Sequence, residues 1–202
     1  MTVSHATITG SENHEPKGVE SASLGFIYVA NGSGSGTWRA LTYTDFRAGP
    51  HVIIQDQKTT GTAPQTLTTG VNTRNLNNLA LNYNTIASLS SNQFTLGAGT
   101  YYMDFWSAFA SSGLAANARS YIRNITDSAD IMPGNTVTWA IYYNISGSNQ
   151  GTLITNGSGV VTIASAKTFE LRMQSSAGYA GGSPATDGRP EIYSQVNITK
   201  LA

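Results

Sequence analysis

Hydrophobic and polar positions alternate with a period of two in the middle of the chain, which is the spacing of a β-strand. The clearest run lies between residues 99 and 110, after a Gly97-Ala-Gly99 turn. One face of this run carries Tyr101, Met103, Phe105, Ser107 and Phe109. The other face carries Tyr102, Asp104, Trp106 and Ala108. Because bulky residues occur on both faces, we expect a second sheet, a neighbouring copy of the chain, or both to cover this strand.

Shorter segments with strand patterns occur before and after this run. They lie at 51–57, 94–96, 120–125, 136–145, 160–163, 167–174 and 191–201. Residues 73–82 fit a helical turn through Leu76 and Leu79, but their four asparagines favour strand and loop. No convincing helix appears. The sequence therefore predicts an all-β fold of about eight to ten short antiparallel strands, arranged as a β-sandwich or jelly roll.

The first 48 residues have a different organisation. Two β-rich runs, 25–30 and 37–42, flank a Gly/Ser/Asn turn and predict a β-hairpin. An isolated hairpin is marginally stable in water, so we expect it to dock on a partner surface. Gly49 and Pro50 then mark a boundary. We predict an anchoring segment at 1–48 and a main domain at 49–202, with the hairpin contacts made by Phe26, Tyr28 and Trp38.

Composition excludes several classes of partner and chemistry. The 202 residues include 11 basic and 11 acidic side chains, and the net charge is zero. This balance argues against nucleic acid or an anionic membrane as the partner. Cysteine is absent, which excludes disulfides and thiolate catalysis. No apolar run has the length of a signal-peptide core or a membrane span, so we expect no membrane insertion.

Metal ligands and cofactor motifs are also lacking. His5, His14 and His51 all lie in or beside the N-terminal segment, without the converging ligands that a metal site needs. The Gly32–Gly36 run lacks the Lys-Ser/Thr and the helix of a phosphate-binding loop, so we interpret it as a hairpin turn. We expect no metal and no cofactor.

Asp104 is the one candidate for acid-base catalysis, since it lies within an aromatic strand. Hydrolysis of a glycan needs a second carboxylate at a set distance, and Glu170 and Glu191 are the formal candidates. Both fall on predicted polar strand faces. We favour a structural ion pair between Asp104 and an arginine of the following strand, Arg119 or Arg123, and predict that the protein is not an enzyme.

Exposed tyrosines suggest binding surfaces, because a flat ring packs well against a sugar or another subunit. The loop 177–190 is rich in Gly and Pro, and loops on a rigid sandwich carry most recognition. Its candidate ligand-binding residues are Tyr179, Asp187 and Arg189. For Tyr142 and Tyr193 a subunit interface is the favoured interpretation.

The order and spacing of several segments resemble a known family. These segments are 74–77, 91–101 with NQFTLGAGTY, 119–127, 167–172, and 191–201 with EIYSQVNITKL. They are similar to the jelly-roll domain of many bacteriophage virion proteins, a domain that resembles the globular head of complement and the tumour-necrosis-factor cytokines. The resemblance covers roughly residues 50–202. The preceding HEPKGVESASLGFIYVANGSGSGTW also resembles a leader module found before such domains in phage structural proteins.

This resemblance implies a ten-stranded sandwich that forms a homotrimer around a threefold axis, with aromatic and aliphatic side chains at the axis. We expect the trimer interface to include Tyr102, Trp106, Tyr142 and Tyr193. Complement-type heads often bind calcium through acidic loops. Here the acidic residues Asp127, Asp130, Asp187 and Glu191 are scattered, so we do not expect calcium.

The resemblance also implies a place on the surface of a virion. A long tail fibre needs an extended shaft, whereas only a hairpin precedes this domain. The leading prediction is therefore a capsid decoration protein or head fibre, anchored through 1–48 to another virion protein such as the major capsid protein. The alternative is a tail-fibre tip that binds host surface glycan through loops such as 177–190. A glycan hydrolase is a third and weaker interpretation.

Overall fold

The computed structural model describes residues 26–30, 36–40, 51–112, 116–139, 150–178 and 180–202. The chain divides into two compact units, Met1–Arg47 and Ala48–Ala202. In the first unit, β1 (Phe26–Ala30) and β2 (Gly36–Ala40) pair in antiparallel register, with Tyr28 opposite Trp38. The two rings meet edge to face, with centroids 5.4 Å apart. The predicted N-terminal hairpin is confirmed.

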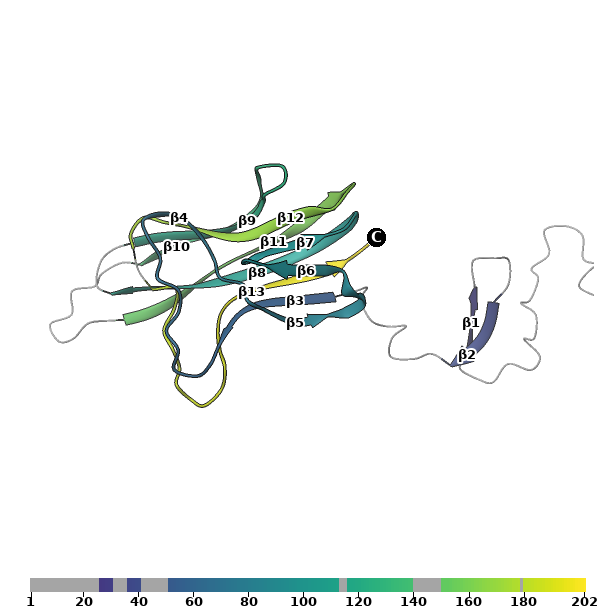
Figure 1. The fold of residues 1–202 in the computed structure, drawn as a ribbon, viewed down its shortest axis with the longest axis horizontal. Helices are drawn as coiled ribbons and strands as arrows, with labels where there is room; N and C mark the ends of the chain where they lie inside the picture. Colours follow the sequence, from purple (N-terminus) through teal and green to yellow (C-terminus); the bar gives the residue numbers. More distant parts are fainter. Residues whose placement is uncertain (1–25, 31–35, 41–50, 113–115, 140–149, 179) are drawn as a thin grey trace, which may run out of the picture. The chain divides into compact units, whose positions relative to one another are not determined.

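The second unit is a sandwich of two antiparallel sheets (Figure 1). The sheet that we call the β8 sheet has the order β11 (Gln150–Ile163), β8 (Gly99–Ser112), β13 (Glu191–Lys200), β3 (His51–Lys58), β5 (Asn78–Asn82). The other, the β9 sheet, has the order β10 (Ala129–Trp139), β9 (Ala116–Asn124), β12 (Lys167–Ser175), β7 (Gln93–Leu96), β6 (Ala87–Ser90), and β4 (Gly70–Thr73) also pairs with β12.

The connections repeatedly cross from one sheet to the other. The chain passes from β7 in the β9 sheet to β8, returns for β9 and β10, crosses to β11, returns to β12 and ends in β13. This connectivity of antiparallel strands in two packed sheets is a jelly roll, so the predicted fold class is confirmed. The only helical element among the described residues is a 3-10 turn, Tyr83–Thr85. No helix in this part of the chain is long and apolar enough to cross a membrane.

The long strand β8 lies between β11 and β13, and its predicted inner face is buried. A large apolar cluster surrounds Met103 and Phe105, and a smaller one surrounds Phe109. Ser107 lies between them on the strand, opposite Thr155 of β11. The Thr155 hydroxyl lies 2.5 Å from the Ser120 hydroxyl of β9, so a buried polar contact joins the two sheets where the apolar clusters separate.

Two glycines bring β10 and β11 together at one side of the sandwich. A Cβ atom on Gly157 would lie 2.5 Å from Cζ of Phe105 and 2.7 Å from Cα of Gly134. A Cβ atom on Gly134 would lie 2.6 Å from the carbonyl oxygen of Asn156. Real Cβ atoms do not approach this closely, so the edges of the two sheets can meet here only because both side chains are absent.

We expect Gly157→Ala to lower the free energy of unfolding by about 1–3 kcal/mol, because the added methyl group overlaps a buried ring and a backbone atom. Thermal unfolding followed by circular dichroism measures this loss. Gly97→Ala is the matched control, since no atom lies within 4 Å of the Cβ position at Gly97. Equal melting temperatures for the two variants would contradict this account of the β10–β11 contact.

The structure departs from the predicted strands mainly at these edges. Strand β11 extends over Gln150–Ile163, far beyond the predicted 160–163, and β10 begins at Ala129 rather than at 136. Residues 73–82 were expected to form strand and loop rather than a helical turn. Strand β5 and the last residue of β4 lie in this range and agree with that expectation. Of the predicted strand at 136–145, residues 136–139 belong to β10, and residues 140–145 lie outside the described residues.

Candidate association surface

The outer face of the β8 sheet, which points away from the core, carries exposed apolar side chains. Tyr102 on β8 is 39% exposed, and Val160, directly opposite on β11, is 60% exposed. Further along the same two strands lie Ile154, which is 46% exposed, and Trp106, which is half-buried. The predicted interface residues Tyr102 and Trp106 therefore both lie on this face. Within a single chain nothing covers Tyr102 or Val160 fully.

A groove of about 510 Å³ runs between β8 and β11 on this face. It is lined by Tyr102, Asp104, Phe105, Trp106, Ile154, Asn156, Gly157 and Ser158. Aromatic rings therefore lie on either side of Asp104, and small polar residues form the opposite wall.

Neutral amide side chains cover the neighbouring strands in a connected series. Gln55 Nε2 donates to Gln195 Oε1 at 2.7 Å, and Gln195 Nε2 donates to Asn197 Oδ1 at 2.8 Å. Asn197 Nδ2 then donates to Asp104 Oδ1 at 2.7 Å. The series crosses β3, β13 and β8, so it fixes the side chains of the whole central face. Paired amides cost far less to bury than charges, which suits a surface that another molecule covers.

The predicted ion pair between Asp104 and an arginine of β9 is wrong. Arg123 pairs instead with Asp130, with 2.7 Å between Nη1 and Oδ1. Arg119 donates from Nε to Thr136 Oγ1 at 2.9 Å. The reason is topological: β8 and β9 follow one another in sequence but lie in different sheets, and these arginines point away from the core.

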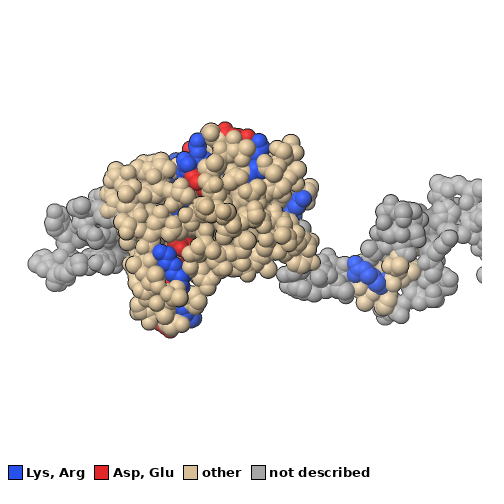
Figure 2. All heavy atoms as spheres, viewed as in Figure 1, with Lys and Arg blue, Asp and Glu red and all other residues tan. Residues whose placement is uncertain are grey.

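The outer face of the β9 sheet has a contrasting, charged character. Figure 2 shows Lys, Arg, Asp and Glu gathered over the upper part of the domain, where β9 and β12 lie in Figure 1. Glu170 on β12 is buried there and accepts hydrogen bonds from Arg172, from Thr73 at 3.2 Å and from Gln93 at 3.2 Å. Glu170 thus lies on the polar face of β12, where these partners cover it, and on a different sheet from Asp104.

Tyr193 is not available to another subunit in this structure, contrary to the prediction. Its side chain is 2% exposed, and its hydroxyl donates to the carbonyl oxygen of Thr62 at 2.7 Å. The chain's own loop covers this end of the outer face: a Cβ on Gly182 would lie 2.7 Å from the Tyr193 ring and 3.2 Å from Ala108. Tyr142, the fourth predicted interface residue, lies outside the described residues.

Two loops, 59–66 and 177–190, run side by side at one end of the domain (Figure 1). The Gly181 amide donates to the Gln65 carbonyl at 2.8 Å, and the Gly188 amide donates to Thr60 Oγ1 at 3.2 Å. Of the three predicted ligand residues, Asp187 and Arg189 form an exposed ion pair with each other at 2.7 Å. Tyr179 lies outside the described residues.

Glu191 fastens the two loops together. Its carboxylate accepts hydrogen bonds of 3.0 Å from the backbone amides of Gly61, Ala185 and Thr186. These bonds stabilise the ionised form and hold the pKa of Glu191 below its ordinary value of 4.5. The Glu191 carboxylate is thus enclosed by the two loops that it joins, and the residue is buried.

The depressed pKa of Glu191 predicts a pH-dependent contribution to stability. The contribution is present above the unfolded-state pKa and is lost as the pH falls through the lower folded-state pKa. We therefore expect Glu191→Gln to melt below wild type at neutral pH, and the difference to shrink as the pH falls below 4.5 and through the lowered folded-state pKa. Melting temperatures across a pH series measure this. A difference that stays constant with pH would contradict the assignment.

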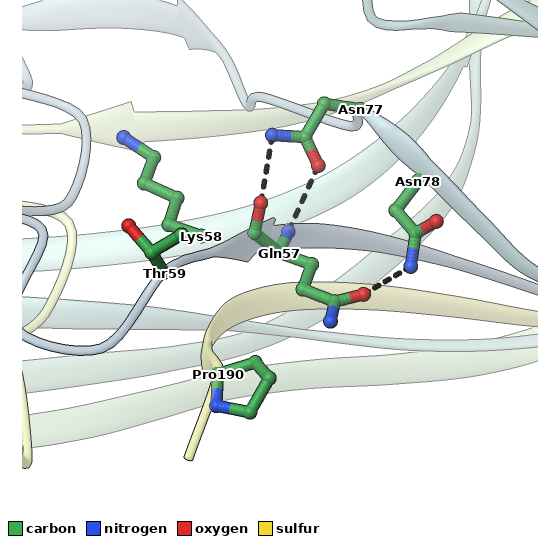
Figure 3. Close-up of a pocket in the computed structure, with 6 residues that line it drawn as sticks. All are labelled: Gln57, Lys58, Thr59, Asn77, Asn78 and Pro190. Atoms are coloured by element: carbon green, nitrogen blue, oxygen red, sulfur yellow. Dashed lines mark hydrogen bonds between the residues drawn. The ribbon is translucent and has the colours of Figure 1, made fainter. Parts of the chain in front are cut away.

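A polar pocket of about 440 Å³ lies where the end of β3 meets the start of β5 and Pro190 (Figure 3). Asn77 pairs with the backbone of Gln57 through both amide atoms, at 2.9 and 3.0 Å, and Asn78 donates to the Gln57 side chain. Lys58 donates to the Ala63 carbonyl at 3.0 Å. Most polar atoms of the pocket thus bond within the protein, which makes it chiefly a joint between β3 and β5.

Two buried residues of opposite charge, Asp56 and Arg74, were not predicted; they interact electrostatically, but neither Asp56 oxygen has a hydrogen-bond partner among the described residues. Both side chains have no exposed surface. Arg74 donates to Gln65 Oε1 at 3.3 Å and to the Gly181 carbonyl at 3.2 Å. Burial raises the pKa of Asp56, opposed by the positive charges of Lys58 and Arg74, and burial lowers the pKa of Arg74 to about 10. Arg74 thus stays charged at neutral pH and holds the root of loop 177–190.

A metal-binding cluster of three or more His, Asp or Glu side chains is not found within the described ranges. His51 lies on β3, where its Nδ1 is 2.9 Å from Thr199 Oγ1, while His5 and His14 lie outside those ranges. The acidic residues considered for calcium are engaged separately: Asp127 with Lys167, Asp130 with Arg123, Asp187 with Arg189.

The chain is similar to several solved structures, and the similarity lies in the fold. No protein-family model and no curated protein sequence matches the chain. Murine APRIL at pH 8.0 is 8% identical, with a TM-score of 0.47 over 75% of this chain and 99% of that one; at pH 5.0 the values are 9%, 0.48, 75% and 98%. The globular domain of zebrafish complement 1qA protein is 15% identical, with a TM-score of 0.39 over 76% of this chain and 98% of that one. The fold itself is established by the strand pairing described above.

Proposed function

We propose that this protein is a non-enzymatic structural protein of a bacteriophage particle, displayed on the virion surface as a homotrimeric jelly-roll knob. The observation that carries the proposal is the contrast between the two outer faces of the sandwich. The β9 sheet presents several charged residues, whereas the β8 sheet presents Tyr102, Val160, Ile154 and Trp106 among neutral amides, with Asp104 bonded to one of these amides. Tyrosine and tryptophan are enriched at protein interfaces, where charged residues are depleted.

A closed ring of three copies would cover the outer face of the β8 sheet in every copy. Each copy places one surface against a different surface of the next copy, and a rotation of one third of a turn closes the ring. Covering Tyr102 and Val160 in this way removes exposed apolar area from water on every copy. The resemblance of the sequence to trimeric phage jelly-roll domains supports the same number of subunits.

The carboxylates support a structural role. Asp104 accepts a hydrogen bond from Asn197, Glu170 pairs with Arg172, and Glu191 binds three backbone amides. Retaining and inverting hydrolysis both require two carboxylates that flank one bond. Here Asp104 and Glu170 lie on outer faces of different sheets, and Glu191 holds the loops.

The N-terminal hairpin is the proposed anchor. Phe26 is an exposed large apolar side chain, and Tyr28 packs on Trp38 across the two strands. A two-stranded hairpin gains stability when it docks on a larger surface. In the proposed arrangement that surface belongs to another virion protein, such as the major capsid protein.

Binding to purified particles tests the proposed location. Labelled full-length protein should bind expanded capsids that lack it, and should not label host cells. Phe26→Asp should weaken capsid binding roughly tenfold or more, because it places a charge where an apolar contact forms. Val71→Asp is the control, since Val71 is an exposed apolar residue of the main domain. Binding to cells and not to capsids would overturn this location.

A second candidate is a tail-fibre tip that binds host surface glycan. The paired loops 59–66 and 177–190 favour it, because Glu191 and Arg74 hold them rigidly at one end of the domain. The amide-lined pocket beside Pro190 offers Gln57 Nε2 and Asn78 Oδ1 to a sugar hydroxyl (Figure 3). Cell labelling that is abolished by Gln57→Ala would favour this function over capsid decoration.

A further inference from the structure

A second groove, of about 290 Å³, opens on the outer face of the β9 sheet. It is lined by Asn117, Ala118, Arg119, Tyr121, Thr136, Gln174 and Ser176. The association surface lies on the opposite face of the sandwich. The groove is therefore separate from that surface.

Arg119 differs from the other exposed arginines of the domain. Arg123, Arg172 and Arg189 each pair with a carboxylate. Among the described residues Arg119 has no carboxylate partner, and its guanidinium bonds through Nε to Thr136 Oγ1 at 2.9 Å. That bond orients the group and leaves Nη1 and Nη2, the fork that binds a carboxylate with two parallel hydrogen bonds, for a ligand.

The strand register places the other groups of the groove around this fork. Thr136 on β10 and Gln174 on β12 lie directly opposite Arg119 on its two sides. Tyr121 lies two residues further along the same face, opposite Arg172. The groove thus combines a charged fork, an amide and a ring that lies beside the ion pair of Arg172 with Glu170.

We propose that this groove binds an acidic sugar, with the sugar carboxylate on Arg119. The Tyr121 ring provides a flat surface for the sugar face, and Gln174 provides donors and an acceptor for hydroxyl groups. The volume lies at the lower end of the range for ligand pockets, which suits one sugar ring. Several copies in one assembly would bind a polymer of such sugars with higher avidity. The site does not depend on the proposed trimer or on a virion location.

Titration of the full-length protein followed by ligand-observed NMR tests the site. The probes are sodium D-glucuronate, the neutral sugar D-glucose, which carries a hydroxymethyl group in place of the carboxylate, and sodium acetate, which has only the carboxylate. We expect glucuronate to bind at least roughly tenfold more tightly than glucose, which cannot form the charge-assisted fork, and at least roughly tenfold more tightly than acetate, which lacks the sugar ring and its hydroxyl groups. Equal binding of glucose, or acetate binding as tightly as glucuronate, would overturn the proposal.

Substitutions on β9 test whether glucuronate binds in this groove. Arg119→Gln should weaken glucuronate binding roughly tenfold or more, and Arg119→Lys should restore only part of it, because lysine keeps the charge but lacks the fork. Arg123→Gln removes the same charge from the same strand face outside the groove and should leave binding unchanged. If Arg119→Gln binds glucuronate as wild type does, the groove is not the site.

Discussion

Replacing Val160 with lysine is expected to convert the proposed trimer into monomers at micromolar concentration while each copy remains folded. Val160 is 60% exposed in the single chain, so a longer side chain there meets no obstacle within the protomer. In the assembly the same position lies beside Tyr102, on the face that we propose is covered. An ammonium group buried there without a partner costs several kcal/mol at each interface.

Light scattering coupled to size-exclusion chromatography measures this dissociation, and circular dichroism checks the fold. Ser88→Lys is the matched control, because Ser88 is exposed on β6, in the other sheet. The control should keep the mass of wild type. If Val160→Lys and Ser88→Lys both remain trimeric, the outer face of the β8 sheet is not the interface.

The second large effect is expected from Arg74→Met. Removing the guanidinium takes away one of the two positive charges that compensate Asp56, the other being Lys58, and leaves the Gly181 carbonyl without its donor. Leaving a buried charge and a buried carbonyl uncompensated costs roughly 3–5 kcal/mol. For a domain of this size that loss lowers the melting temperature by about 6–20 °C. Thermal and urea unfolding measure it, and loop 177–190 should become more sensitive to proteolysis.

Two further variants separate the buried pair from a general effect of losing an arginine. Arg123→Met breaks the exposed pair with Asp130 and should cost less than about 1 kcal/mol. Asp56→Leu combined with Arg74→Met replaces both charges with apolar groups and should recover much of the loss. An Arg74→Met variant as stable as Arg123→Met would contradict the role that we assign to this pair.

The alternation of residues 101–109 was sufficient to predict β8 and its two faces, because a strand covered on both sides keeps bulky residues on both. It was not sufficient for β11. Gly157 and Gly159 interrupt the apolar pattern there. At Gly157 the strand passes so close to Phe105 and Gly134 that a side chain is excluded, and at Gly159 a Cβ atom would lie only 3.2 Å from Met132. Such close approaches depend on the opposite sheet and leave no periodic signal in the strand itself.

For the candidate association surface, too, the alternation of residues predicted some features and missed others. Alternation placed Tyr102 and Trp106 on the outer face, where the structure has them. It also suggested that Tyr193 is open, but the loop around Gly182 covers it, and loop paths cannot be read from strand periodicity. The pairing of Asp104 failed because consecutive strands lie in different sheets. Asp56 had a readable signal, since it shares the face of Val52 and Ile54, which are buried.

The mass of the full-length protein in solution tests the central claim most directly. Light scattering at micromolar concentration should give three times the 21.3 kDa of one chain. It should give the same value at the ends of a tenfold dilution, as expected for a stable closed ring. A mass of one chain at these concentrations, or a dimer, would contradict the account.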